Sequence, residues 1–98
     1  MDLNFKQIRA RITNHVMVNH GDTDVVGTKF AENLTEKDIF DGLVSRIDES
    51  NATGKTSAGG NHEHILSWPG VGANGENHVR VWMAPNGELG SMWPIVPS

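Results

Sequence analysis

The feature that most constrains the fold is a predicted β-hairpin over residues 78–94. Its first arm, residues 78–83, alternates apolar side chains with polar or aromatic ones, which places the two kinds on opposite faces of a strand. The sequence Pro-Asn-Gly comes next and predicts a turn, because Pro presets φ and because Asn and Gly tolerate positive φ. One face of the hairpin should therefore pack on a core, while the other presents His78, Arg80 and Trp82.

The turn leaves two registers open. If residues 85–87 form a type I turn with a Gly bulge, Val81 pairs with Ser91, which then faces the core. If the turn has only two residues, Trp82 pairs with Ser91, which then shares a face with Arg80. A slip of one residue exchanges the faces of a strand. The proline in the turn favours the bulged form.

Two helices are predicted upstream of the hairpin. Residues 3–18 carry an apolar stripe at helical spacing, made of Phe5, Ile8, Ile12 and Val16. The second helix follows Thr35, which is a typical N-cap before an acidic first turn. It carries its own apolar face and is expected to end at residues 51–54.

Residues 62–68 alternate as a further strand, after a small-residue segment, 50–60, that we expect to be a flexible linker. Gly54, Lys55 and Thr56 match the end of a phosphate-binding loop, but that motif needs a strand before it and a helix after it. The order is reversed here, so we expect a solvated loop whose lysine and hydroxyl could still meet a phosphate.

The predicted fold class is therefore α+β, in one domain. Two N-terminal helices pack on a three- or four-stranded antiparallel sheet that ends in the hairpin. No apolar run approaches the ~18 residues of a membrane span. The first residues are not typical of a signal peptide.

Charge limits the classes of partner. The 98-residue chain has a formal net charge of −4 and no cysteine, which excludes thiolate metal sites and cysteine nucleophiles. An acidic balance disfavours binding nucleic acid by bulk electrostatics. The acidity is concentrated, however, in residues 21–50, and all five histidines lie outside that segment. A neutral or basic site elsewhere on the chain remains open.

The histidines offer two kinds of chemistry. His62 and His64 share one face of a strand, and His78 on a neighbouring strand could complete a three-histidine zinc site. No further ligand pattern supports that alternative, so we expect no metal and no other cofactor. His15 and His20 bracket the end of the first helix, and either could act as a general base or acid near neutral pH.

Arg80 among histidines on a sheet face indicates a different chemistry. RNA cleavage by the 2′-hydroxyl needs a base, an acid and a cation for the developing phosphorane charge. Histidine and arginine supply these groups without metal. Trp82 or Trp93 could stack a splayed base.

The order of elements resembles the small toxin nucleases of the barnase–EndoU–colicin–RelE group. It comprises a helix ending in His-x4-His, an acidic capped helix, a Gly-rich loop and a terminal hairpin with segments 79–82, 86–89 and 91–94. Such domains occur at the C-termini of contact-dependent inhibition and related polymorphic toxins. They pack helices on an antiparallel sheet and cut RNA, often tRNA, without metal.

The resemblance implies particular site residues and partners. The implied catalytic candidates are His15, His20, Arg80 and Ser91, with His62 and His64 behind them. The candidates for substrate binding are Lys55, Thr56, Trp82 and Trp93. A toxin of this kind would be secreted, act in the cytoplasm of a target cell and have a cognate immunity protein.

We therefore carry two hypotheses. The first is a metal-independent ribonuclease toxin domain. The second is a small acidic binding or inhibitor protein without catalysis, such as a phage antagonist, which would act in the cytoplasm. A shared cleft of Arg80 with His15 or His20 would favour the enzyme, whereas scattered histidines and a dominant acidic face would favour the binder.

Overall fold

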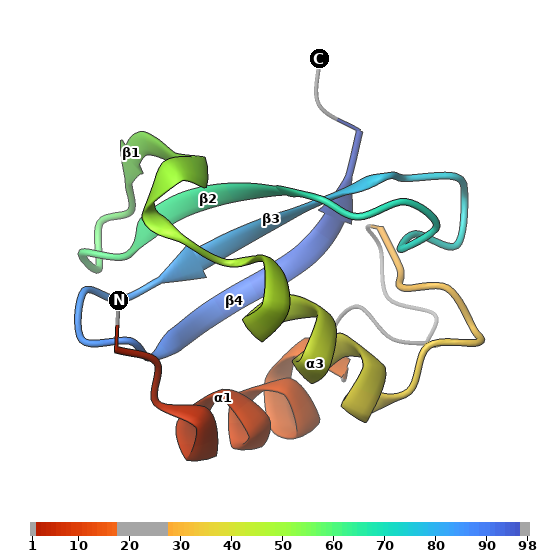
Figure 1. The fold of residues 1–98 in the computed structure, drawn as a ribbon, viewed down its shortest axis with the longest axis horizontal. Helices are drawn as coiled ribbons and strands as arrows, with labels where there is room; N and C mark the ends of the chain where they lie inside the picture. Colours follow the sequence, from red (N-terminus) through yellow and green to blue (C-terminus); the bar gives the residue numbers. More distant parts are fainter. Residues whose placement is uncertain (1, 18–27, 97–98) are drawn as a thin grey trace.

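The computed structural model describes residues 2–17 and 28–96 and has the predicted α+β fold (Figure 1). The helical elements are α1 (Phe5–Arg11), the π-helix η1 (Ile12–Val16), α3 (Glu36–Arg46) and the 3-10 helix η2 (Glu49–Asn51). The strands are β1 (Ala52–Thr56), β2 (His62–Ser67), β3 (His78–Met83) and β4 (Leu89–Ile95). They form one antiparallel sheet in the order β1-β2-β3-β4. The α-helices lie on one side of this sheet.

The first predicted helix divides into two kinds of helix. Asn4 caps α1 by accepting a hydrogen bond from the backbone N–H of Gln7, and the chain widens into the π-helix at Ile12. Ile8, Ile12 and Val16 are buried as the apolar stripe predicts. The stripe could not reveal the π-helix, because residues four apart share a face in either form.

Helix α3 begins as predicted but ends earlier. Thr35 and Asp38 form a capping box, and the hydrogen bonds from the backbone and side chain of Thr35 lower the pKa of the Asp38 carboxyl. The helix ends at Arg46 because Ile47 is extended. The Asp48 side chain then accepts hydrogen bonds from the backbone and hydroxyl of Ser50, which favours a turn over further helix.

The flexible linker expected at residues 50–60 is wrong, because its first part is the edge strand β1. Every residue of this strand is exposed. A strand without a buried face has no alternation of apolar and polar residues, and so it gives no signal of the kind that revealed the other strands. An irregularity in its pairing with β2 includes Gly54, whose φ is +89°.

The hairpin combines features of both predicted registers. Its loop is the three-residue form, with Gly87 N–H donating to Ala84 O and with a φ of +87° at Gly87. Yet Trp82 pairs with Ser91, as predicted for the two-residue turn. The shift of register between Trp82 and Met83 explains both, because it leaves Gly90 as an extra residue in β4.

Helix α1 docks on this bulge. Gln7 accepts a hydrogen bond from Leu89 N–H at 2.7 Å and donates one to Leu89 O at 3.0 Å. Arg11 donates to Gly90 O at 2.8 Å. The backbone groups at the bulge are thereby satisfied from the helix instead of from β3.

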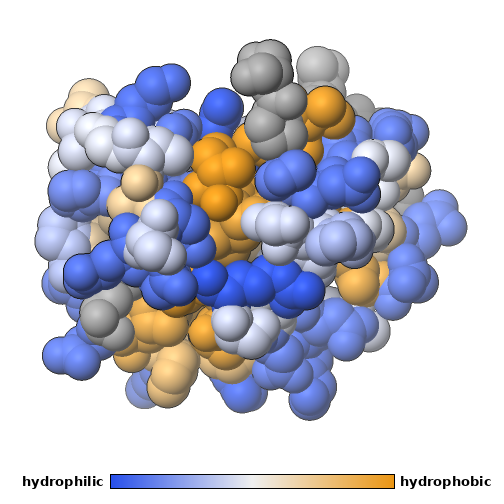
Figure 2. All heavy atoms as spheres, turned by 45° about the horizontal axis from the view of Figure 1, so that its top comes forward, coloured by the Kyte–Doolittle hydropathy of each residue, from blue (hydrophilic) through white to orange (hydrophobic). Residues whose placement is uncertain are grey.

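The core lies between the helices and the inner face of the sheet. It includes Ile8, Ile12, Ile39 and Leu43 from the helical elements and Leu66, Val79, Val81, Met83 and Met92 from the strands. Outside it, most of the surface seen in Figure 2 is hydrophilic, and hydrophobic atoms emerge near the middle and in smaller areas towards the edges, including the lower edge. In the described part of the chain, no helix has the length and apolar character needed to cross a membrane.

Candidate functional site

Nine side chains form a regular array on the sheet face that points away from the helices, which we call the open face. Its members are Glu63, Ile65 and Ser67 of β2, His78, Arg80 and Trp82 of β3, and Ser91, Trp93 and Ile95 of β4. They belong to the open face because side chains alternate along strands whose other residues enter the core. All but the buried Glu63 are at least partly exposed.

A carboxylate and a guanidinium meet at the centre of the open face. Arg80 Nε lies 2.9 Å from Glu63 Oε2. The contact is an ion pair without hydrogen-bond geometry, since neither of these buried atoms has a hydrogen-bond partner. The other carboxylate oxygen, Oε1, accepts a hydrogen bond of 2.7 Å from the hydroxyl of Thr53. Glu63 is only 4% exposed, so its charge is held largely away from water next to one cation.

Two tryptophans flank the cation. Trp93 pairs directly with Arg80 across β3 and β4, and the guanidinium carbon lies 5.9 Å from the centre of its ring. Trp82 stands two residues along β3, on the same face, and pairs with Glu63 on one side and Ser91 on the other. The predicted residues Arg80, Ser91, Trp82 and Trp93 are therefore brought together.

His78 is the imidazole nearest in sequence to this group. It projects from the same face of β3 as Arg80, and residues two apart on a strand are ~7 Å apart. Ser67 and Ile95 are its partners on the neighbouring strands. The open face thus carries one carboxylate, one guanidinium, one imidazole and hydroxyl groups on adjoining positions.

The predicted residues His62 and His64 do not join Arg80, because they alternate to the inner side of β2. His62 is exposed at the sheet margin, and His64 is 2% exposed. The Nδ1 of His64 lies 2.8 Å from Asn51 Oδ1 and 3.1 Å from Asp48 O. Asn51 donates from its Nδ2 to Arg46 O, which fixes its oxygen towards the ring. Because both neighbouring oxygens are acceptors, His64 Nδ1 carries the proton and donates a hydrogen bond. This interaction links β2 to η2.

Acidification should destabilise the fold through His64. Burial lowers the pKa of His64 below its usual value of 6.5, so between the two values the unfolded chain binds more protons than the folded one. We expect the free energy of unfolding to fall as the pH drops below ~6.5, and to level off only below the folded pKa. Urea titrations of the native chain between pH 7.5 and 5 should show this loss.

A His64→Gln variant provides the comparison. It should lose most of the pH dependence in that interval, whereas replacement of the exposed His62 by Gln should keep it. An unchanged slope in His64→Gln would contradict the assignment of the buried imidazole as the responsible group.

Of the remaining predicted positions, one lies in the helix layer, one lies outside the described residues, and two lie on the edge strand β1. His15 belongs to η1, in the helix layer on the other side of the sheet. His20 lies outside the residues that the structure describes. Lys55 and Thr56 are exposed on the edge strand β1, where Lys55 N–H donates to the Thr53 hydroxyl.

The three-histidine zinc alternative is wrong in its geometry. His78 projects from the open face, whereas His62 and His64 project from the inner face, so the three imidazoles do not converge. Within residues 2–17 and 28–96, no three side chains of His, Asp or Glu are grouped so that they could hold a metal ion.

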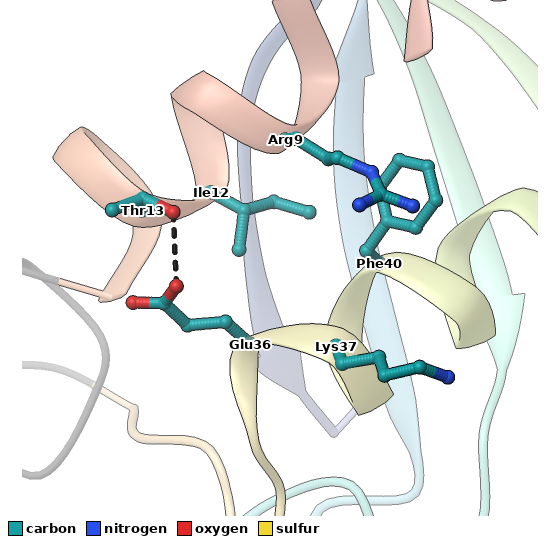
Figure 3. A pocket seen from close by; sticks show the side chains of 6 residues that line it. All are labelled: Arg9, Ile12, Thr13, Glu36, Lys37 and Phe40. Atoms are coloured by element: carbon teal, nitrogen blue, oxygen red, sulfur yellow. Dashed lines mark hydrogen bonds between the residues drawn. The ribbon is translucent and has the colours of Figure 1, made fainter. Parts of the chain in front are cut away.

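Two hollows lie elsewhere on the molecule. One, of about 290 Å³, opens between the first helical segment and α3 (Figure 3) and is lined by Arg9, Ile12, Thr13, Glu36, Lys37 and Phe40. There the Thr13 hydroxyl donates to Glu36, and the Arg9 guanidinium lies 4.5 Å from the Phe40 ring centre. The Lys37 ammonium, in contrast, pairs with Asp41, which does not line the hollow. The second hollow lies beside His62, His64 and Pro85.

Glu63 is the residue of this site that the sequence did not single out. The sequence did contain a pattern that could have revealed it, because Glu63, Ile65 and Ser67 occupy the face of a predicted strand opposite to His62 and His64. What was missing was the pairing of β2 with β3, which puts Glu63 diagonally beside Arg80. That pairing depends on the length and shape of the connection at residues 69–77.

The fold and site define a small α+β protein with a polar and aromatic open sheet face. No family model matches the chain, and neither the curated proteins nor the solved structures include a significant match to it.

Proposed function

We propose that this chain is a metal-independent endoribonuclease domain of the toxin type. The observation that carries the proposal is the contact of Glu63 with Arg80 on an open sheet face that also holds His78. A carboxylate, an imidazole and a fixed cation are sufficient for RNA cleavage by the 2′-hydroxyl. Each is on a rigid strand, which suits a reaction that depends on positioning.

The proposed reaction is a transesterification. A base on the protein takes the proton of the 2′-hydroxyl, and the oxygen attacks the adjacent phosphorus. The bond from phosphorus to the 5′-oxygen breaks, and an acid protonates that oxygen. The products are a 2′,3′-cyclic phosphate and a free 5′-hydroxyl. No water, metal or oxidant is consumed in this step.

The proposal gives three groups of the open face a role in this reaction. Arg80 faces the phosphate and stabilises the negative charge that grows on its oxygens. Glu63 and His78 are the two groups able to exchange protons, and they lie on either side of Arg80 along the neighbouring positions of β2 and β3. The Ser91 hydroxyl lies on β4, diagonally from Arg80 and separated from Glu63 by Trp82.

Other parts of the toxin hypothesis remain proposals on the same footing. The target would be a cellular RNA such as tRNA, reached in the cytoplasm of a target cell, and a cognate immunity protein would block the open face. His15 supports catalysis less well than His78, because it lies in the helix layer. The role predicted for His20 stays a prediction.

The test is incubation of the purified chain with total RNA, with and without EDTA, and the products are resolved on a denaturing gel. We expect fragments that end in a cyclic phosphate, and we expect their formation to fall sharply in His78→Ala. His62→Ala is the matched control, because its imidazole lies on the opposite face of the sheet. Intact RNA under all conditions would contradict the proposal, and activity lost only on chelation would favour a metal enzyme.

A second function, a non-catalytic binding protein, is favoured by the scatter of the described histidines: His15 lies in the helix layer, and His78 projects from the face opposite to His62 and His64. The exposed side of α3 carries three carboxylates, of Glu36, Asp38 and Asp41, and the last of these pairs with Lys37 on the same helix. If RNA stays intact, this surface and the partly exposed tryptophans become the features to test against protein partners.

A further inference from the structure

We propose that the open face binds single-stranded RNA by stacking unpaired bases on Trp82 and Trp93, on either side of Arg80, and that it discriminates against duplex RNA. This inference rests on the proposed function and specifies its substrate class. It concerns only how the substrate is held and makes no use of the proton-transfer groups.

The placement of the two indoles supports stacking. Trp93 is the direct cross-strand partner of Arg80, and Trp82 is two residues further along β3, so the rings occupy diagonal positions around one cation. Both are partly exposed on a face without a packed helix from the described residues. The third tryptophan, Trp68, is 6% exposed and belongs to the core, which shows that burial was available to an indole in this fold.

A cation lies next to the two indoles. The Arg80 side chain is about one third exposed. Its exposed part can meet a phosphate oxygen of a nucleotide whose base stacks on a neighbouring indole.

Charge decides between single-stranded and duplex RNA. The nine side chains of the open face carry one full positive charge, Arg80, and one full negative charge, Glu63, while the chain as a whole has a net charge of −4. Duplex RNA hides its base faces inside the helix and is held mostly through backbone contacts across a groove. A face with one cation cannot supply many such contacts. Unpaired bases, in contrast, can be bound through their π-faces.

The experiment uses a short 2′-O-methyl RNA, which lacks the attacking hydroxyl and so cannot be cut. Its binding to the full chain is measured by fluorescence anisotropy, alone and annealed to its complement. We expect the single strand to bind at least tenfold more tightly. Its logarithmic salt dependence should be shallow, with a slope of about −0.7, as for one neutralised phosphate.

Substitutions then locate the binding. Trp82→Leu and Trp93→Leu should each weaken binding about fivefold or more, because stacking on an aromatic ring is lost. Trp82→Phe and Trp93→Phe keep a π-face and should retain most of the affinity. Phe5→Ala is the matched control: Phe5 is an aromatic residue, 56% exposed, that belongs to the helix layer, and its loss should not change binding.

The outcomes separate this inference from the proposed function. Equal affinity for the duplex, a slope of several units, Leu variants that bind normally, or no binding at all would each overturn the inference. RNA cleavage accompanied by any of these results would leave the nuclease proposal standing alone. Tight, tryptophan-dependent binding without cleavage of ordinary RNA would support the inference as a binding activity and reject the nuclease.

Discussion

Replacement of Arg80 by Met should lower the rate of RNA cleavage by ~10²–10³-fold, the usual cost of losing one fixed charge that stabilises a transition state. The same substitution should also destabilise the fold. Glu63 is buried, and Arg80 is the cation in contact with it, so the variant leaves a carboxylate out of water without its partner. Because the Arg80 side chain is about one third exposed, we expect a loss of ~2–3 kcal/mol, below the range for a fully buried pair.

A second substitution separates the two effects. In the double variant Arg80→Met with Glu63→Gln, no charge remains buried, and the amide oxygen introduced at position 63 can still accept from the Thr53 hydroxyl. Stability should recover by ~1–3 kcal/mol relative to Arg80→Met alone, which a double-mutant cycle in urea measures as a coupling energy. Cleavage should stay at the low level, because the double variant also lacks Glu63, one of the two proposed proton-transfer groups. The cleavage rate of Arg80→Met per folded molecule is the measurement that isolates the role of Arg80.

The comparison distinguishes a positioning role from a direct one. If the double variant regained cleavage together with stability, neither Arg80 nor Glu63 would act on the substrate, and both would serve only to hold the sheet in shape. If Arg80→Met cut RNA at the native rate while it was folded, the proposed contact with phosphate would be wrong. Circular dichroism at the assay temperature shows which fraction of each variant is folded, so that rates can be compared per folded molecule.

The elements that the sequence predicted well are those with one buried face. Burial is what the two clearest patterns predict, because apolar residue types favour buried positions. These patterns are the stripe of Ile8, Ile12 and Val16 and the alternation of Val79 and Val81, and all five residues are buried. Strand β1 has no buried residue, so composition alone made it look like a linker. Its strand pairing comes from the free edge of β2, which is a property of the sheet rather than of the segment.

The site shows the same distinction. Arg80, Trp82 and Trp93 could be found because they lie within one predicted hairpin, whose faces follow from alternation. Glu63 required the pairing between strands that are separated by the connection at residues 69–77. The position of Ser91 required the bulge at Gly90, which changes the register after the turn has set it. Neither the pairing nor the bulge is encoded in the residue pattern of a single element.

Substitution of Gly42 by Ala should strongly destabilise the protein, although it places a better helix former inside α3. Helix propensity alone would stabilise the variant by ~1 kcal/mol. Gly42 is buried, however, and a Cβ at this position would lie 2.0 Å from Cζ2 of Trp68 and 2.3 Å from Cη2. Such contacts are far below van der Waals distance, so either the indole or the helix has to move.

Either movement costs free energy, because Trp68 is held by other contacts. The Arg46 guanidinium lies 4.5 Å from the centre of the Trp68 ring and restricts its movement. The backbone N–H of Trp68, just after β2, donates to Asn77 O. Overpacking of this kind costs ~1–3 kcal/mol or more, which exceeds the gain in propensity. We expect a net loss of about 2 kcal/mol, and hence a melting temperature lower by about 8–16 °C in a domain of this size.

The double variant Gly42→Ala with Trp68→Leu tests the cause. A smaller side chain at position 68 makes room for the methyl group, so the second substitution should cost less in the Gly42→Ala background than in the native one, as measured by thermal and urea unfolding. Ser45→Ala, also in α3 but exposed, is the control for propensity without a clash. If Gly42→Ala were as stable as the native chain, the close approach of α3 to Trp68 would be wrong. The seating of α3 against the end of β2, where the strand turns towards residues 69–77, would then have to be revised with it.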